Sequence, residues 1–225
     1  MGRRGDADVT VTLQAVRGRQ RLLLDWSGGL AGAVLGAFTA YPVLSARGLV
    51  MAAVAPAIAI GLGIATGARA SKGLHEDPPP NPVLRAALAR RRYLTALRPL
   101  ALLVTVYTVV LAPMAGTVPL VARLGACLAL FGLALVHLSV AYTVGIGTGR
   151  WRLTILLTAG MALLGYGVHA AVSPTGVLAP VRLLSPWHWY LTPNPLQFSL
   201  AAILVPVAVS ALIFLVGWLD YRRDG

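Results

Sequence analysis

Six long blocks of apolar residues limit the folds that are open to this chain. They cover approximately residues 26–44, 49–68, 99–116, 124–146, 153–172 and 198–218. A helix needs ~20 apolar residues to cross a hydrocarbon core of ~30 Å, and each block is close to that length. Only 12% of the 225 residues are charged, which is about half the charged fraction of a soluble domain. The pattern predicts an all-α integral membrane protein with six transmembrane helices.

The positions of the basic residues predict the orientation of the chain. Of the 19 Lys and Arg residues, 16 lie in residues 1–24, 69–98, 150–152 and 219–225, and the other three are Arg47, Arg123 and Arg182. Short cytoplasmic loops carry the excess of Lys and Arg in membrane proteins. We therefore expect both termini on the cytoplasmic side of a plasma membrane. All the basic residues except Lys72 are Arg, which points to a GC-rich prokaryotic genome.

The same boundaries give the domain organisation. Residues 1–24 form a basic cytoplasmic or interfacial segment, residues 25–218 the six-helix transmembrane domain, and residues 219–225 a basic cytoplasmic tail. Within the domain, residues 69–98 form a long cytoplasmic loop and residues 173–197 an outer loop. Four prolines between residues 78 and 82 prevent a continuous helix through the cytoplasmic loop, and residues 83–97 are predicted to form a short basic helix after them.

Small residues indicate where helices approach one another. Gly28, Gly32 and Gly36 recur every four residues in the first block, which places them on one helix face. Such faces allow close helix packing in lipid. Gly145, Gly147 and Gly149 alternate between the fourth and fifth blocks, where we expect a flexible turn.

The sequence argues against several kinds of chemistry. A P-loop ends in Gly-Lys-Ser/Thr, but the only lysine, Lys72, lies between Ser71 and Gly73. We therefore expect no ATP site in this chain, and any ATP hydrolysis would belong to a separate subunit. The leading interpretation is a chain that is not an enzyme and binds no cofactor. All seven acidic residues fall at or beyond the predicted cytoplasmic ends of the spans, whereas ion-coupled carriers commonly keep a carboxylate at mid-membrane. Basic and aromatic residues do not alternate on a polar segment, so no nucleic-acid partner is expected.

The intramembrane histidines and the single cysteine suggest no metal site. His137 and His169 lie on different spans without a flanking ligand pattern, so we interpret them mainly as packing and hydrogen-bonding residues. A role in ligating metal or haem, or in relaying protons, is the alternative. Cys127 is the only cysteine, which excludes a disulfide within the chain.

The most distinctive stretch is residues 184–196, LSPWHWYLTPNPL, in the outer loop. Its prolines fix turns, and its Trp and Tyr side chains favour the membrane–water interface. The stretch is interpreted either as an interfacial re-entrant loop that anchors the last helix or as a gate on the outer side. The predicted outer-loop or gate residues are Ser185, Pro186, Trp187, His188, Trp189, Tyr190 and Pro195.

At this stretch the chain resembles the permease subunits of type-2 ABC transporters, in six-span prokaryotic exporters. Those permeases often carry a Ser-Pro-aromatic-His/aromatic-Tyr segment and a Pro-Leu pair before the last helix, which residues 185–190, Pro195 and Leu196 match in order. The ending at Arg222, Arg223 and Asp224 is similar to the aromatic-Arg-Arg-Asp tail of that family. The loop after the second span departs from the family, because it has no Gly-Thr pair.

The resemblance implies a permease that forms the substrate path of an ATP-driven exporter. Its partners would be ABC ATPase subunits and a second permease chain, identical or different, together with membrane lipid. The cytoplasmic loop would then contact the ATPase, and the predicted coupling residues are Lys72, Glu76, Asp77, Arg90, Arg91 and Arg92. Two alternatives remain open: a six-span secondary transporter or channel, and a non-catalytic membrane assembly subunit or small membrane enzyme. The apolar spans suit lipid, drug or peptide cargo alike.

Overall fold

The computed structural model of the protein describes residues 54–75, 79, 81–111, 119–172, 177–191 and 199–223. The chain divides into two compact units, Met1–Ala46 and Arg47–Gly225. All the described residues belong to the second unit, and every contact given below lies within it. The predicted first span with Gly28, Gly32 and Gly36 lies outside the described residues, as do Glu76, Asp77 and Pro195.

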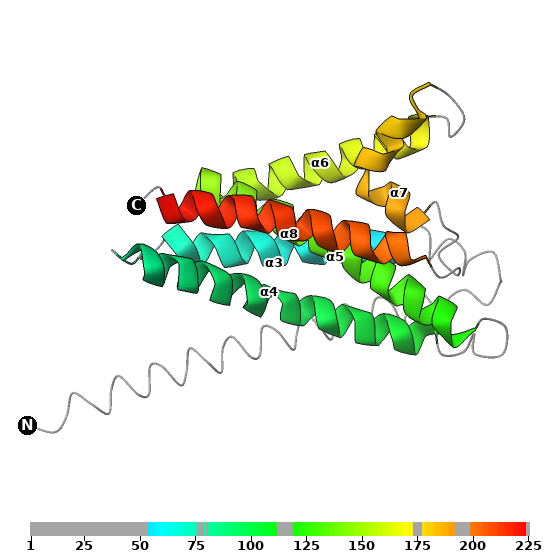
Figure 1. Ribbon diagram of the computed structural model, residues 1–225, viewed down its shortest axis with the longest axis horizontal. Coiled ribbons are helices and arrows are strands. Elements are labelled where there is room, and N and C mark those ends of the chain that lie inside the picture. Colours follow the sequence, from blue (N-terminus) through cyan, green and yellow to red (C-terminus); the bar gives the residue numbers. More distant parts are fainter. Residues whose placement is uncertain are drawn as a thin grey trace, which may run out of the picture. The chain divides into compact units, whose positions relative to one another are not determined.

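The described part of the chain is helical and contains no strand, which confirms the all-α prediction. Its elements are α3 (Ala55–His75), α4 (Pro82–Leu111), α5 (Leu120–Thr148), α6 (Trp151–Ala171), the 3₁₀ helix η3 (Ala179–Leu184), α7 (Pro186–Leu191) and α8 (Leu200–Arg223) (Figure 1). Three of them, α5, α6 and α8, are long and apolar enough to cross a membrane. They correspond to the fourth, fifth and sixth predicted spans.

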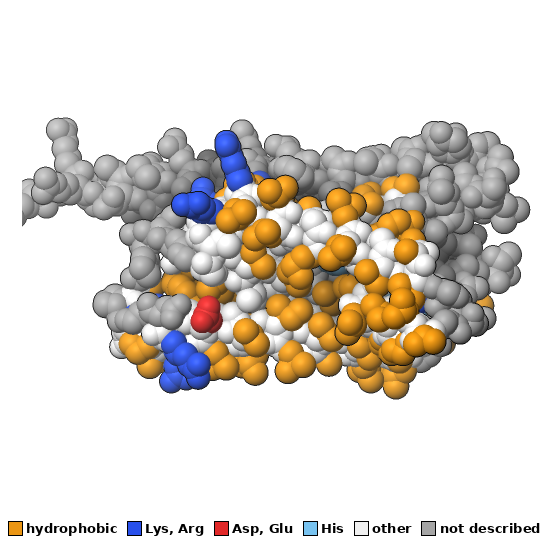
Figure 2. Space-filling model, turned by 90° about the horizontal axis from the view of Figure 1, so that it is seen from above, with side chains coloured by type: hydrophobic (Ala, Val, Ile, Leu, Met, Phe, Trp, Pro, Cys, Tyr) orange, Lys and Arg blue, Asp and Glu red, His pale blue; other side chains and the backbone are white. Residues whose placement is uncertain are grey.

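Helix α5 lies at the centre of this unit, with α3, α4, α6 and α8 packed against it (Figure 1). Of its most apolar stretch, 78% is buried, compared with 17% for α6 and 22% for α8. Helices α6 and α8 therefore direct leucines outward, and Leu163 is 74% exposed. Figure 2 shows one face with apolar side chains over most of its area and Lys and Arg gathered toward one end.

A column of small residues explains how closely α3 approaches α5. Ala55, Ala59, Gly63, Gly67 and Ser71 recur every four residues and are all buried. A Cβ atom on Gly63 would overlap the backbone carbonyl oxygen of Ala134, and one on Gly67 would overlap that of Leu138. Without Cβ atoms, the two backbones come into direct contact, which is how small residues promote helix association in lipid.

Helix α4 differs from the sequence-based prediction. We expected a short basic helix over residues 83–97 and a separate span from residue 99, but Pro82–Leu111 is one continuous helix of 30 residues with Pro99 inside it. Pro82 stands at its first position, where the missing N–H costs nothing, and the Asn81 side-chain oxygen accepts a 2.8 Å hydrogen bond from the Val83 backbone N–H. The helix has a length of ~45 Å. The prediction of two separate elements was wrong.

The proline-rich interruption itself is confirmed, since α3 ends at His75 and α4 begins at Pro82. The predicted glycine turn is confirmed only in part. Gly145 and Gly147 continue α5, and only Gly149, with a φ of 61°, leaves the helix. Gly145 packs directly against Ser71 of α3, where a Cβ atom would overlap the Ser71 side chain.

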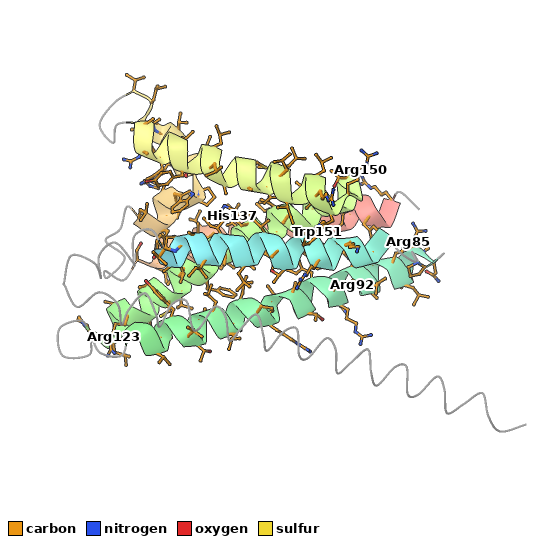
Figure 3. The ribbon with its side chains drawn as sticks, turned by 180° about the vertical axis from the view of Figure 1, so that it is seen from behind. Arg85, Arg92, Arg123, His137, Arg150 and Trp151 are labelled. Atoms are coloured by element: carbon orange, nitrogen blue, oxygen red, sulfur yellow. The ribbon has the colours of Figure 1, made fainter. Side chains whose placement is uncertain are left out.

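Arginine residues mark the two ends of the bundle. Arg85, Arg92 and Arg150 lie toward one end, and Arg123 lies at the other (Figure 3). We call these the Arg85 end and the Arg123 end. His137 lies between them on α5. Its imidazole is buried, and its Nδ1 lies 2.8 Å from the Leu133 carbonyl oxygen of the same helix, which fits the packing interpretation.

Candidate functional site

At the Arg123 end, residues 177–191 fold back onto α6. Ser185 is buried, and its hydroxyl donates a 2.7 Å hydrogen bond to the Gly165 carbonyl while accepting one of 3.2 Å from the Trp187 N–H. The Trp187 indole N–H donates to the Ala162 carbonyl at 3.2 Å, and its ring meets that of Tyr166 at 5.0 Å in a T-shaped contact. These bonds fix the start of α7 against α6.

The other end of α7 enters the bundle. The Tyr190 side chain is only 1% exposed, and its hydroxyl neighbours that of Tyr107 on α4 and the thiol of Cys127 on α5. Burial raises the pKa of Tyr190 to about 12, so this hydroxyl stays protonated at physiological pH. Thr108 on α4 also contacts Cys127, with its Oγ1 at 3.4 Å from Sγ. Helix α7 thus packs on α5, α6 and α8, and through Tyr190 it reaches Tyr107 of α4.

The predicted outer-loop residues therefore separate into two groups. Ser185, Trp187 and Tyr190 are buried contacts with the spans, and Pro186 is the first residue of α7. His188 and Trp189 are half-buried. The Trp189 indole N–H donates a 3.0 Å hydrogen bond to the Leu183 carbonyl within the same segment. These contacts pack the segment against α6 and, through Tyr190, beside Tyr107 of α4 and Cys127 of α5.

A cluster of positive and titratable groups lies beside this segment. Arg182 of η3 places Nη2 at 3.3 Å from Nε2 and 3.5 Å from Nδ1 of His169 on α6. The rings of His169 and His188 are 6.2 Å apart, and that of His188 meets Trp189 at 5.2 Å and 90°. Partial burial and then the Arg182 charge lower the pKa of His188, so its imidazole is neutral at neutral pH.

At the Arg85 end, aromatic side chains join α4, α5 and α8. The Tyr93 ring lies 4.1 Å from Phe214 and 5.4 Å from Tyr142. The hydroxyls of Tyr93 and Ser139 are 2.7 Å apart, and the Tyr142 hydroxyl donates to the Ala89 carbonyl at 2.8 Å. Each buried hydroxyl therefore has a partner on a neighbouring helix, as buried polar groups require.

At the Arg85 end, α8 also forms hydrogen bonds to α3 and α4. The Trp218 indole N–H donates a 3.1 Å hydrogen bond to the Ala86 carbonyl of α4, and the Tyr221 hydroxyl donates one of 3.0 Å to the Leu74 carbonyl of α3. The residues that flank the proline-rich interruption are thus held together by one helix, although 147 positions separate Leu74 from Tyr221.

The predicted coupling residues that the structure describes differ in exposure. Lys72 is exposed on α3, Arg90 and Arg91 are exposed on α4, and Arg92 is half-buried. Arg85, which we did not predict, is buried at 6% exposure on the inward side of α4. A helical wheel could have found it, because Arg85, Ala89, Arg92 and Ala96 fall at spacings of three and four residues. The contacts of Tyr190 and the cluster at Arg182 left no comparable pattern in the sequence.

Within the described ranges, no group of three His, Cys, Asp or Glu side chains could hold a metal ion. Comparisons with known proteins add no relative, because no family model, curated protein or solved structure matches the chain. The arrangement has a segment packed against the helices at one end, a basic end opposite, and one long helix, α4, that reaches both.

Proposed function

We propose that the chain is the membrane-spanning permease subunit of an ATP-driven exporter of the type-2 ABC class. The observation that carries the proposal is the continuity of α4. Its first half holds the exposed arginines of the predicted coupling region, and its last turns place Tyr107 beside Tyr190 of the re-entrant segment. A force on one end of this helix would therefore reach the segment that closes the other end.

The contacts at the Arg85 end support this coupling. Trp218 and Tyr221 of α8 hold the carbonyls of Ala86 and Leu74, so α3, α4 and α8 would move there as one body. Pro99 divides α4 into a basic half and an apolar half and removes one hydrogen bond of the helix ladder. Prolines are a common site of helix kinks, so α4 can change its bend at Pro99.

In the proposed assembly the chain crosses a prokaryotic plasma membrane six times, with both termini and the Arg85 end in the cytoplasm. Two such permease chains, identical or different, would stand above two ATPase subunits. The ATPase supplies the free energy, and the permease supplies two conformations whose balance shifts when the ATPase subunits close. Closure would act on residues 69–92 and release Tyr190 of α7 from its position beside Tyr107 and Cys127.

The proposal is tested by co-purification and by reconstitution. The tagged chain, expressed with a candidate ABC ATPase encoded beside it, should elute with that ATPase. In reconstituted vesicles, the rate of ATP hydrolysis by the ATPase should change when the chain is present. Transport that runs on an ion gradient alone, with no ATPase retained, would instead establish the secondary-carrier alternative.

Exposed arginines allow a sharper test of the coupling region. Arg90→Gln together with Arg91→Gln should reduce the change in ATP hydrolysis rate that the chain causes. The melting temperature should stay the same, because both side chains are exposed. Arg152→Gln is a matched control, since Arg152 is exposed and follows the α5–α6 turn near Arg150. Glu76→Gln with Asp77→Asn should resemble the first pair. An equal response in all three variants would contradict a coupling role for this loop.

A further inference from the structure

Arg182 is a half-buried guanidinium near the Arg123 end of the bundle. Its Nε–H is buried and donates to no partner among the described residues, where the guanidinium contacts His169 through Nη2. The sequence holds no acidic residue between Asp77 and Asp220. Asp220, the one carboxylate in the described part, lies twenty residues after Leu200 on α8, which is ~30 Å along that helix.

The groups around Arg182 are imidazoles, which carry either no charge or a positive one. His169 comes from α6, Arg182 from η3 and His188 from α7, so three elements bring them together. The two imidazoles stand 6.2 Å apart, and the guanidinium reaches one of them at 3.3 Å. Because a charge out of water is costly without a partner, an anion from outside the chain would stabilise this group.

We propose that His169, Arg182 and His188 form a binding site for a phosphate group. Guanidinium matches phosphate because its planar fork can donate two parallel hydrogen bonds, and these charge-assisted bonds are about twice as strong as neutral ones. Each imidazole adds one N–H donor, and a second ring proton becomes available on protonation. Phosphate is carried by lipid headgroups and by soluble molecules, and the site recognises the group they share.

The histidines make binding depend on pH. Among the described residues, Arg182 and His169 lie near His188, and the Arg182 charge opposes its protonation. A bound phosphate supplies the opposite charge and favours the protonated ring. A phosphodiester keeps one negative charge over this range, so it should bind more tightly at about pH 6 than at about pH 7.5, where histidine charge changes.

The proposal stands apart from the exporter assignment, because it concerns only what binds at Arg182. The protein would be purified in a phosphate-free maltoside detergent and titrated with inorganic phosphate, with tryptophan fluorescence as the readout. Trp189 contacts the His188 ring edge-on and should report its protonation. In parallel, native mass spectrometry would count the phosphatidylglycerol molecules that the protein retains, with a phosphate-free galactolipid as the comparison.

Arg182→Gln should weaken phosphate binding by about tenfold or more, because it removes the charged fork. His188→Gln should retain binding but remove most of its pH dependence. Arg123→Gln is the matched control, since Arg123 is the other described arginine toward that end. It takes no part in the Arg182–His169 contact or the His169–His188 contact. Melting temperatures would verify folding, and Arg182→Lys, which keeps the charge but loses the fork, replaces Arg182→Gln if that variant does not fold.

The lipid count and the fluorescence titration together identify the source of the phosphate. Loss of one retained phosphatidylglycerol in the Arg182 variant, but not in Arg123→Gln, would identify a lipid headgroup. A saturable fluorescence change with inorganic phosphate and an unchanged lipid count would identify a soluble phosphate. The proposal is overturned if the wild-type protein shows neither, or if the Arg182 and Arg123 variants lose binding equally, because general attraction to positive charge then explains it.

Discussion

The hydroxyl of Tyr142 on α5 donates a 2.8 Å hydrogen bond to the backbone carbonyl of Ala89 on α4. Tyr142 is fully buried, and its bond joins positions that are 53 residues apart. Tyr142→Phe keeps the ring contacts with Tyr93 and Phe214 but leaves the Ala89 carbonyl without this donor. We expect a loss of about 0.5–1.5 kcal/mol in unfolding free energy, measured by denaturation in detergent.

The control for this substitution is Tyr166→Phe. Tyr166 is 48% exposed on α6 and contacts Trp187 through its ring, so its hydroxyl should contribute little to stability. Equal losses of unfolding free energy in Tyr142→Phe and Tyr166→Phe would mean that the hydrogen bond to Ala89 does not stabilise the fold.

Gly67→Ala should destabilise the contact between α3 and α5. The new Cβ would overlap the Leu138 carbonyl oxygen and lie 3.0 Å from the Cβ of Ala141. Forced overpacking of this kind costs about 1–3 kcal/mol. Gly61→Ala is the matched substitution, because Gly61 lies on the same helix with nothing within 4 Å of the added atom. It should be neutral or raise stability by about 0.5–1 kcal/mol, and thermal unfolding of both variants would show the difference.

Pro99→Ala tests whether bending of α4 is used. The substitution restores one backbone hydrogen bond and should raise helix stability by up to ~3 kcal/mol, which would appear as a higher melting temperature. If α4 transmits motion by changing its bend at Pro99, the stabilised variant should transport more slowly in reconstituted vesicles. A variant that is more stable and transports at the wild-type rate would argue that α4 moves as a straight rod.

The single cysteine provides a reporter for opening of the α7 segment. Cys127 is 2% exposed and lies beside Tyr190, so a membrane-impermeant maleimide should react with it slowly. Trp187→Ala removes the bond to the Ala162 carbonyl and the ring contact with Tyr166. We expect labelling to become at least about tenfold faster, since the rate follows the population of the open form when opening and closing are fast.

Trp189→Ala is the control in that experiment. Its indole bonds only to Leu183 within the same segment, so the contacts with α6 remain and labelling should stay close to the wild-type rate. Fast labelling of the unmodified protein would show that α7 does not cover Cys127.

Periodic and compositional signals predicted much of this fold. The predicted spans over residues 124–146, 153–172 and 198–218 match α5, α6 and α8 to within about five residues at either end. The proline interruption before α4 was also predicted, because proline lacks an N–H and opposes helix locally. The continuity of α4 through Pro99 was not predicted, since it depends on tertiary contacts, such as those of Tyr93 before the proline and Tyr107 after it.

The sequence by itself determined where the apolar helices lie, where prolines interrupt them, and which segments carry the basic charge. These are local properties of length and composition. The tertiary structure alone decided that α5 is central, that Arg85 is buried, that Tyr190 enters the bundle, and that Arg182 meets two histidines. The physical reason is that lipid tails are as apolar as a leucine side chain. Hydrophobicity therefore marks a helix as membrane-spanning, but only packing decides which side faces protein.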